Sequence, residues 1–224
     1  MADKYDIEAR YVPALACSVP FMAFGYYFLK NIDSKFWDAT SALAIGSLGI
    51  SAAMFLVAIH LSTTVGKVIE LKLFRGGLNL PTTEFLLAES TYLSEDRKKA
   101  IRNKIKNKFG VDIRKKTEGT LQNRQVINEA VGEVRRSMRK NKFVLQKNIQ
   151  YGLTRNLLSG SMLAFLASLA VFMTGNLVHN TTAVTVATVM IFLYLLFAGT
   201  AALLFMHAAR QYASMLFDEF MGDS

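Results

Sequence analysis

The sequence predicts an all-α membrane protein, with four transmembrane helices in two hairpins and a mostly helical cytoplasmic insert between spans 2 and 3. Three stretches contain no Asp, Glu, Lys or Arg: residues 11–29, 39–66 and 156–209. A surface helix of a soluble domain carries a charged residue on its wet face every few positions, so stretches of this length exclude an ordinary soluble domain. The third stretch has 54 residues, enough for two passes through the hydrocarbon layer at about 20 residues each.

The positive charge is concentrated between the two apolar parts of the chain. Residues 67–155 contain 21 Lys and Arg against 9 Asp and Glu, a net charge of +12, whereas the whole chain carries +9. Basic residues that flank apolar spans are retained on the cytoplasmic side of a membrane. We therefore expect this insert in the cytoplasm, and with two spans on each side of it we expect both termini there as well.

Four segments follow from these boundaries. They are the N-terminal segment with the first transmembrane hairpin (1–66), the basic cytoplasmic domain (67–155), the second transmembrane hairpin (156–209) and a cytoplasmic C-terminal tail (210–224). The expected spans are about 11–29, 42–63, 156–174 and 184–207, joined in each hairpin by a short outer loop, near 30–38 and 174–182.

Prolines and small residues distinguish the expected spans. Pro13 and Pro20 lie inside the first span, where each removes a backbone donor. The resulting kink is tolerated when a neighbouring helix bonds the freed carbonyl. Gly160, Ala164 and Ser168 lie on one face of the third span. Small residues at this spacing let helices approach closely, either within one bundle, which we favour, or between subunits.

The insert is expected to be helical for most of its length. Ser94 is a typical N-cap and Gly110 a typical residue just past a helix end, so a helix is predicted between them. Its apolar stripe is Ile101, Ile105 and Phe109. A second helix is predicted at about 123–140, with an apolar face of Ile127, Val131, Val134 and Met138.

Two other parts of the insert connect it to the spans. Residues 78–87 contain Pro81 and are expected to form a loop or a short extended piece. From Phe143 the helical pattern continues through Tyr151 into the third span, interrupted only by Gly152. Movement in the insert can then pass to the membrane helices along one helix.

The sequence contains no catalytic, metal-binding or phosphate-binding motif, so we expect neither an enzyme nor a cofactor. The expected spans also lack the charged residue that a coupled transporter or proton relay normally carries. Four helices of this size cannot both pack together and enclose a water-filled path. A conducting form therefore requires a homo-oligomer, such as a tetramer, with its pore on the symmetry axis. The candidate pore-lining residues are Ser41, Ser47 and Ser51 in the second span, or Ser159, Ser161 and Ser168 in the third.

Clustered Lys and Arg side chains on the two helices of the insert form a candidate polyanion-binding site. They are Arg97, Lys98, Lys99, Arg102, Lys106, Arg135, Arg136, Arg139 and Lys140. One interpretation is that they rest on anionic lipid of the bilayer, at about 1 kcal/mol per basic group. The other is that they bind a nucleotide signal or a single-stranded nucleic acid. Composition alone favours the lipid.

Two segments shift that balance. Leu80-Pro81-Thr82-Thr83-Glu84-Phe85-Leu86-Leu87 and Asn148-Ile149-Gln150-Tyr151-Gly152-Leu153-Thr154-Arg155-Asn156-Leu157 resemble segments of a family of bacterial membrane effectors of anti-phage defence, similar to the Hailong type. The resemblance implies an oligomeric channel in the bacterial inner membrane that opens on infection and depolarises the cell. It further implies control by single-stranded DNA that a partner nucleotidyltransferase makes, and the basic insert is where we place that contact.

The leading hypothesis is therefore a multi-pass, ligand-gated ion channel or pore with the insert as its sensor. Tyr151, Gly152 and Arg155, where the insert enters the membrane, are the candidate gating and coupling residues. Arg155 can equally serve as an anchor whose charged end reaches the interface. The alternatives are a non-conducting scaffold that recruits a cytoplasmic partner or nucleic acid to the membrane, and a small-solute transporter.

Overall fold

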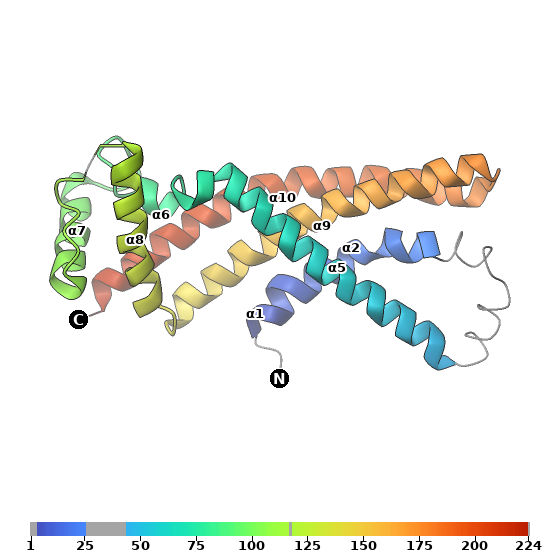
Figure 1. Ribbon diagram of the computed structural model, residues 1–224, viewed down its shortest axis with the longest axis horizontal. Coiled ribbons are helices and arrows are strands. Elements are labelled where there is room, and N and C mark those ends of the chain that lie inside the picture. Colours follow the sequence, from blue (N-terminus) through green and yellow to red (C-terminus); the bar gives the residue numbers. More distant parts are fainter. Residues whose placement is uncertain (1–3, 26–43, 117, 224) are drawn as a thin grey trace. The chain divides into compact units, whose positions relative to one another are not determined.

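The computed structural model describes residues 4–25, 44–116 and 118–223, and in these ranges all regular secondary structure is helical (Figure 1). The chain divides into two compact units. The apolar unit comprises Met1–Lys67 and Gly152–Leu204, and the basic unit comprises Val68–Tyr151 and Phe205–Ser224. The all-α class predicted from the sequence is confirmed.

The apolar unit contains the helices that carry the uncharged stretches. Its elements are α1 (Lys4–Asp6), the π-helical turn η1 (Ile7–Tyr11), α2 (Val12–Phe24), most of α5 (Ala44–Leu73), and parts of α9 (Lys142–Leu177) and α10 (Thr181–Gly222). Within this unit α9 and α10 form an antiparallel hairpin (Figure 1), whose turn includes His179 at φ +53°. Among the described residues, α9 and α10 are long and apolar enough to cross a membrane. The arrangement of four spans stays a prediction.

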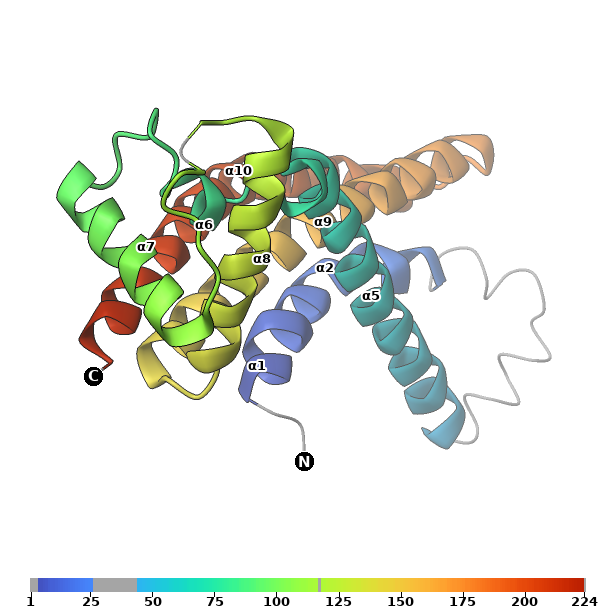
Figure 2. The same ribbon diagram turned by 60° about the vertical axis from the view of Figure 1, so that its left-hand side comes forward.

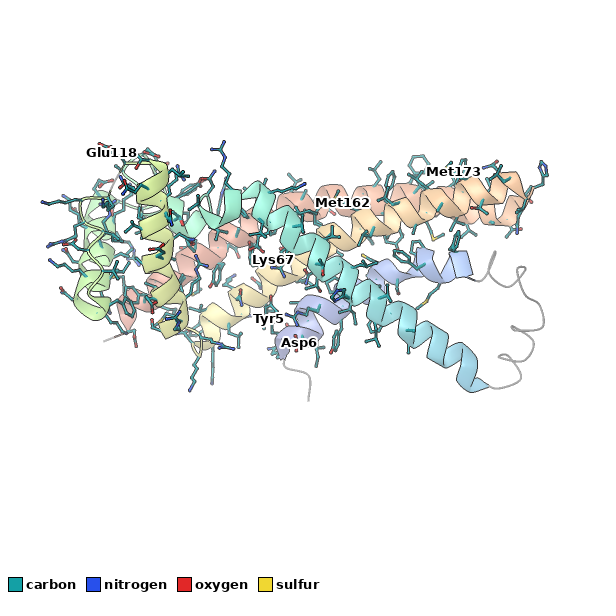
Figure 3. The ribbon with its side chains drawn as sticks, viewed as in Figure 1. Tyr5, Asp6, Lys67, Glu118, Met162 and Met173 are labelled. Atoms are coloured by element: carbon teal, nitrogen blue, oxygen red, sulfur yellow. The ribbon has the colours of Figure 1, made fainter. Side chains whose placement is uncertain are left out.

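Several small residues of the apolar unit are buried, and many of its large apolar residues are exposed. Ala164, Ala183 and Ala187 are fully buried, whereas Met162 and Met173 of α9, labelled in Figure 3, are 46% and 65% exposed. Exposed large apolar side chains of this kind are typical of a surface that contacts a membrane or another protein. The small face expected on the third span, Gly160, Ala164 and Ser168, is buried within this unit.

The basic unit has an apolar core surrounded by short helices. Besides the ends of α5, α9 and α10 it contains the 3-10 turn η3 (Arg75–Gly77), α6 (Pro81–Glu84), α7 (Glu95–Phe109) and α8 (Leu121–Ser137). Figure 2 shows α7, α8 and the C-terminal end of α10 together. The core includes Phe85, Leu86, Leu87, Ile101, Ile105, Ile113, Ile127, Val131, Val134, Met138, Ala213, Leu216, Phe217 and Phe220.

Local signals placed α7 and α8 correctly. The Ser94 hydroxyl accepts a hydrogen bond from the Arg97 N–H, and Gly110 follows α7 at φ +73°. Thr120 caps α8 in the same way, and the predicted apolar face of α8 is buried. The helix ends at Ser137, three residues before the predicted end, and a turn follows.

Two parts of the basic unit contain more helix than the sequence analysis expected. Residues 78–87, expected to be a loop or a short extended piece, form turns around the short helix α6. Pro81 is at the first helical position, where its fixed φ and missing N–H cost nothing. The stretch 210–224, expected to be a tail, continues α10 to Gly222. Arg210 ends the uncharged stretch, but Ala213, Leu216, Phe217 and Phe220 recur at helical spacing and are buried in the core.

Candidate functional site

Two of the predicted polyanion-binding residues, Lys98 and Arg102, are buried in the basic unit. Lys98 is 1% exposed, and its ammonium donates to Ala88 O at 3.2 Å, Ser90 O at 2.5 Å and Glu95 Oε1 at 2.7 Å. Arg102 is 3% exposed and donates to Leu86 O. These three carbonyls belong to the segment between α6 and α7. In this arrangement Lys98 and Arg102 hold that segment against α7 and present no charge to a ligand.

A different set of α7 cations contacts the C-terminal end of α10. Arg97 forms an ion pair with Asp218, and Lys108 forms one with Asp223 at 2.5 Å. Lys104 donates to Met221 O at 3.3 Å and also to Asp223 O. We call Arg97, Lys104 and Lys108 the α7 basic row. Sequence analysis included only Arg97 of this row among the site residues.

An aromatic ring lies beneath the α7 basic row. The ammonium groups of Lys104 and Lys108 are 5.4 and 5.7 Å from the centre of the Phe220 ring, which stacks on Phe109 at 5.9 Å. Phe220 is fully buried. The C-terminal end of α10 is thus held by the burial of Phe220 and by the ion pairs and cation–π contacts of the α7 basic row.

The remaining predicted cations differ in their partners. Lys106 pairs with Asp112 at 3.2 Å, and Arg136 pairs with Glu133 at 2.9 Å. Arg135 is half-buried and donates to Asn128 Oδ1 at 3.0 Å. Lys99, Arg139 and Lys140 are exposed, and no ion pair is shown for them with any residue that the structure describes. Much of the predicted positive surface is therefore already paired with anions of the chain itself.

Three carboxylates of the basic unit, Asp223, Glu95 and Asp112, have lowered pKa values. The hydrogen bond from Lys108 lowers the pKa of Asp223, and Lys98 lowers the pKa of Glu95 in the same way. Arg114 and, to a smaller extent, Lys106 lower the pKa of Asp112. Burial lowers the pKa of Arg102 from its ordinary value, yet an arginine remains charged near pH 7. The carboxylates of Asp223, Glu95 and Asp112 are therefore ionised near pH 7.

The predicted coupling residues lie where α9 passes from one unit to the other. Tyr151 is the last residue of the basic unit along α9; it is buried and stacks on Phe205 at 5.2 Å and on Tyr212 at 6.1 Å. Gly152 is the first residue of the apolar unit, and a Cβ there would lie 2.7 Å from Tyr5 Oη, so α9 approaches the N-terminal helix closely. Arg155 is buried, and its Nε donates to Asn156 Oδ1 at 3.2 Å.

Asn156 and Tyr194 bond the carbonyls that the two prolines deprive of an α-helical donor. The sequence analysis quoted Asn156 in the resembling segment without a role and did not select Tyr194. Pro13 has no N–H for Ala9 O, and Asn156 Nδ2 donates to that oxygen at 2.6 Å. The second bond follows the same rule, since Pro20 has no N–H for Ala16 O and Tyr194 Oη donates to it at 2.7 Å. The expected rescue of freed carbonyls by neighbouring helices is therefore observed twice. The sequence could have indicated which carbonyls need a new donor, because each proline lacks the N–H that would bond the carbonyl four positions before it.

The candidate pore-lining serines do not define a path within the described part of the chain. Ser41 lies outside the described residues. Ser47 and Ser51 are in α5, but their side chains also lie outside what the structure describes. The serines of the third span, Ser159, Ser161 and Ser168, are fully buried. Ser159 donates to Ser62 O at 2.5 Å and Ser168 to Ala164 O at 2.7 Å, so these hydroxyls serve helix packing.

Comparisons with protein-family models, with curated proteins and with solved structures found no match to this chain. The resemblance of residues 80–87 and 148–157 to the Hailong type stays a prediction. Part of the first segment nevertheless has a structural role, because Thr82 and Thr83 are buried in α6. In the second, Gly152 and Asn156 make the close contacts described above. Across the described residues, no group of three or more His, Cys, Asp and Glu side chains is placed to hold a metal ion.

Proposed function

We propose that this protein is an oligomeric effector of the bacterial inner membrane. It forms a gated ion channel or pore that depolarises the membrane in anti-phage defence, under the control of a nucleotide or single-stranded DNA signal on the basic unit. The observation that carries the proposal is the continuity of three helices. Each of α5, α9 and α10 contains residues of both units.

Helix continuity supplies a physical route from sensor to gate. A helix is held by a ladder of backbone hydrogen bonds, so a shift of one end is transmitted along it more directly than through a flexible linker. In α9, the helix passes from the stacked ring of Tyr151 in the basic unit to the close contact at Gly152 in the apolar unit. A rearrangement of the basic unit that moves Tyr151 therefore acts on α9 directly.

The polar groups of the apolar unit support a pore between subunits rather than one within a subunit. Asn156, Ser159 and Ser168 are buried and bonded to helix carbonyls, which leaves them to hold helices together. A water-filled path needs polar groups facing a lumen. In a homo-oligomer that lumen lies on the symmetry axis, and its wall comes from a face that is exposed on the single chain.

The proposal is tested by ion flux in reconstituted vesicles. The purified protein is inserted into liposomes loaded with potassium, and efflux is followed with and without an oligothymidylate 20-mer on the outside. Protein with its basic unit outside should show efflux that the oligonucleotide changes. In cells, induced expression without any partner protein should collapse the membrane potential if the signal holds the channel closed.

A variant of Tyr151 tests the coupling between the basic unit and the pore. Tyr151→Ala removes the stacked ring at the end of the basic unit, whereas Phe143→Ala removes an exposed ring (59% exposed) near the start of the same helix. We expect Tyr151→Ala to abolish the effect of the oligonucleotide on efflux, and Phe143→Ala to preserve it. Absence of efflux from the wild-type protein under every condition, together with normal potential and viability on overexpression, would contradict a pore.

A non-conducting scaffold is the second candidate, and the internal bonding of the polar groups in the apolar unit is the observation that favours it. A scaffold holds nucleic acid or a partner at the membrane through the basic unit and needs no lumen. Flotation of the same liposomes separates the two functions. A labelled oligonucleotide that floats with vesicles showing no efflux supports the scaffold, whereas efflux that responds to the oligonucleotide supports the channel.

A further inference from the structure

The α7 basic row is a line of three cations on one side of a helix. Arg97, Lys104 and Lys108 are at relative positions i, i+7 and i+11, which fall on one face of an α-helix. From the first to the last, the row extends about 16 Å along the helix axis. The other flank of α7, Lys98 and Arg102, is occupied by backbone carbonyls. The row is therefore the flank of α7 whose charges are directed at anions.

The anions on the row are side chains of the same chain. Asp218 in α10 and Asp223 just after it pair with Arg97 and Lys108, and Lys104 donates to the backbone oxygens of Met221 and Asp223. Carboxylate and phosphate oxygens make the same charge-assisted hydrogen bonds to guanidinium and ammonium groups. The two aspartates thus occupy positions that a chain of phosphates can take.

These ion pairs are accessible to a competitor. The side chains of Arg97 and Asp218 are 44% and 48% exposed, and those of Lys108 and Asp223 are 37% and 44% exposed. Exposed ion pairs are weak and screened by salt, so a polyanion that brings several charges at once can replace them. Ala213, Leu216 and Phe217 are fully buried before the last turn, so they hold α10 in the core even when the last turn, with Phe220, is freed.

We propose that the α7 basic row is a binding site for a soluble phosphodiester chain, and that Asp218 and Asp223 are its built-in competitor. Binding of the ligand replaces the two carboxylates and releases the last turn of α10. Because α10 is one helix from Thr181 to Gly222, the release acts on a helix that is long and apolar enough to cross a membrane. This inference deepens the proposed function, on which it rests for the consequence of binding but not for the binding itself.

Binding of a fluorescent oligothymidylate 20-mer to the full-length protein in detergent micelles tests the competition. The variant is Asp218→Asn/Asp223→Asn. Its matched control is Glu118→Gln/Glu129→Gln, which removes the same two negative charges at exposed positions of the basic unit away from the row; Glu118 is labelled in Figure 3. We expect the aspartate variant to bind at least about threefold more tightly than the control, because releasing two ion pairs exceeds the general effect of net charge. Equal affinity of the two variants would overturn the proposal.

A second measurement identifies the cations. Arg97→Gln/Lys104→Gln/Lys108→Gln should bind more weakly, with the slope of log K against log salt reduced by about 2, as expected for three lost contacts to single-strand phosphates. If this variant keeps the wild-type salt slope, the α7 basic row is not the binding site. Inorganic polyphosphate should displace the oligonucleotide, because the row contacts phosphates and no bases. Failure of polyphosphate to compete overturns a phosphate-based site.

A third measurement tests the released turn and separates this inference from the proposed function. Addition of the oligonucleotide should increase amide hydrogen exchange at residues 218–223 of the wild-type protein and leave residues 213–217 protected. Protection of residues 213–217 in each variant also shows that the variant is folded. Unchanged exchange at 218–223 speaks against release. If the oligonucleotide binds and the last turn of α10 is released, but neither the wild-type protein nor any variant conducts ions in liposomes, the channel proposal is contradicted and this inference is supported. If conduction responds to the oligonucleotide while the aspartate variant binds like its control, the inference fails alone.

Discussion

Asn156 donates its side-chain amide to the carbonyl of Ala9, the oxygen whose α-helical donor is missing because position 13 is a proline. The two residues are 147 positions apart in the chain, and the bond joins α9 to the N-terminal helix inside the apolar unit. A buried carbonyl oxygen that loses its helical donor to a proline needs another hydrogen-bond partner, and here the donor comes from a neighbouring helix. The bond therefore ties the kink to the packing of two helices.

Asn156→Ala should destabilise the protein, and Pro13→Ala should reverse most of that loss. Removing the amide leaves a buried carbonyl without its donor, at a cost of about 1–3 kcal/mol, whereas Pro13→Ala restores an N–H. Thermal unfolding in detergent is measured for the wild type, the two single variants and the double variant, which together form a double-mutant cycle. Asn176→Ala is the control, since that exposed amide bonds Phe172 O of its own helix. An equal loss in the Pro13→Ala background would show that Asn156 acts through something else.

Tyr194→Phe should show the same dependence on Pro20. The change keeps the ring in its buried position and removes only the hydroxyl that bonds Ala16 O, with an expected loss of about 0.5–1.5 kcal/mol in unfolding free energy. Pro20→Ala supplies the missing backbone donor and should reduce the loss. Tyr11→Phe, at a partly exposed ring that contacts Phe55 edge-on, should change little. If Tyr11→Phe and Tyr194→Phe lower the unfolding free energy by similar amounts, the hydrogen bond to Ala16 O does not explain the effect of Tyr194→Phe.

Gly160→Ala should destabilise, although alanine is the better helix former. A Cβ at position 160 would lie 2.9 Å from Cys17 Sγ and 3.2 Å from Cys17 Cβ, closer than packed side chains normally approach. Gly199→Ala meets nothing within 4 Å and should stabilise by up to about 1 kcal/mol. Melting temperatures of the two variants should therefore move in opposite directions. A stabilised Gly160→Ala protein would mean that α2 and α9 are not in contact at this point.

The adjacent lysines 98 and 99 should behave differently. Lys98→Ala leaves the carbonyls of Ala88 and Ser90 without their buried donor, and a loss of about 1–3 kcal/mol in unfolding free energy is expected. Lys99 is exposed, so Lys99→Ala should fall within about 0.5 kcal/mol of the wild type. Chemical denaturation followed by circular dichroism compares the pair. Similar stability of the two variants would argue that Lys98 is not buried in solution.

The ion pair of Lys108 with Asp223 should be lost in acid. The lysine lowers the pKa of Asp223 below its ordinary value of 3.8, so the unfolded chain takes up this proton at a higher pH than the folded chain. The stabilisation is then present above 3.8 and disappears as the pH falls through the lowered pKa. The difference in melting temperature between wild type and Asp223→Asn should be constant near neutrality and shrink in that acid range. A difference that is the same at every pH would rule out this linkage.

Local chemistry explains which parts of the fold were predictable. The ends of α7 follow from Ser94 and Gly110 because capping involves residues within one turn of each other. The last span was ended near Arg210, the first charged residue after it, although charge limits burial in lipid and not helix formation, and α10 continues to Gly222. The burial of Lys98 was missed because its partners are backbone carbonyls, which no side-chain pattern marks.

The sequence by itself determined where apolar helices and positive charge lie, since hydropathy and net charge are properties of consecutive residues. It also determined the positions of the two prolines, and hence which carbonyls lose a donor. Only the tertiary structure decided that Asn156 and Tyr194 bond those carbonyls and that Asp218 and Asp223 occupy the α7 basic row. Such bonds join residues more than a hundred positions apart, and which of many donors meets an acceptor depends on how the helices pack.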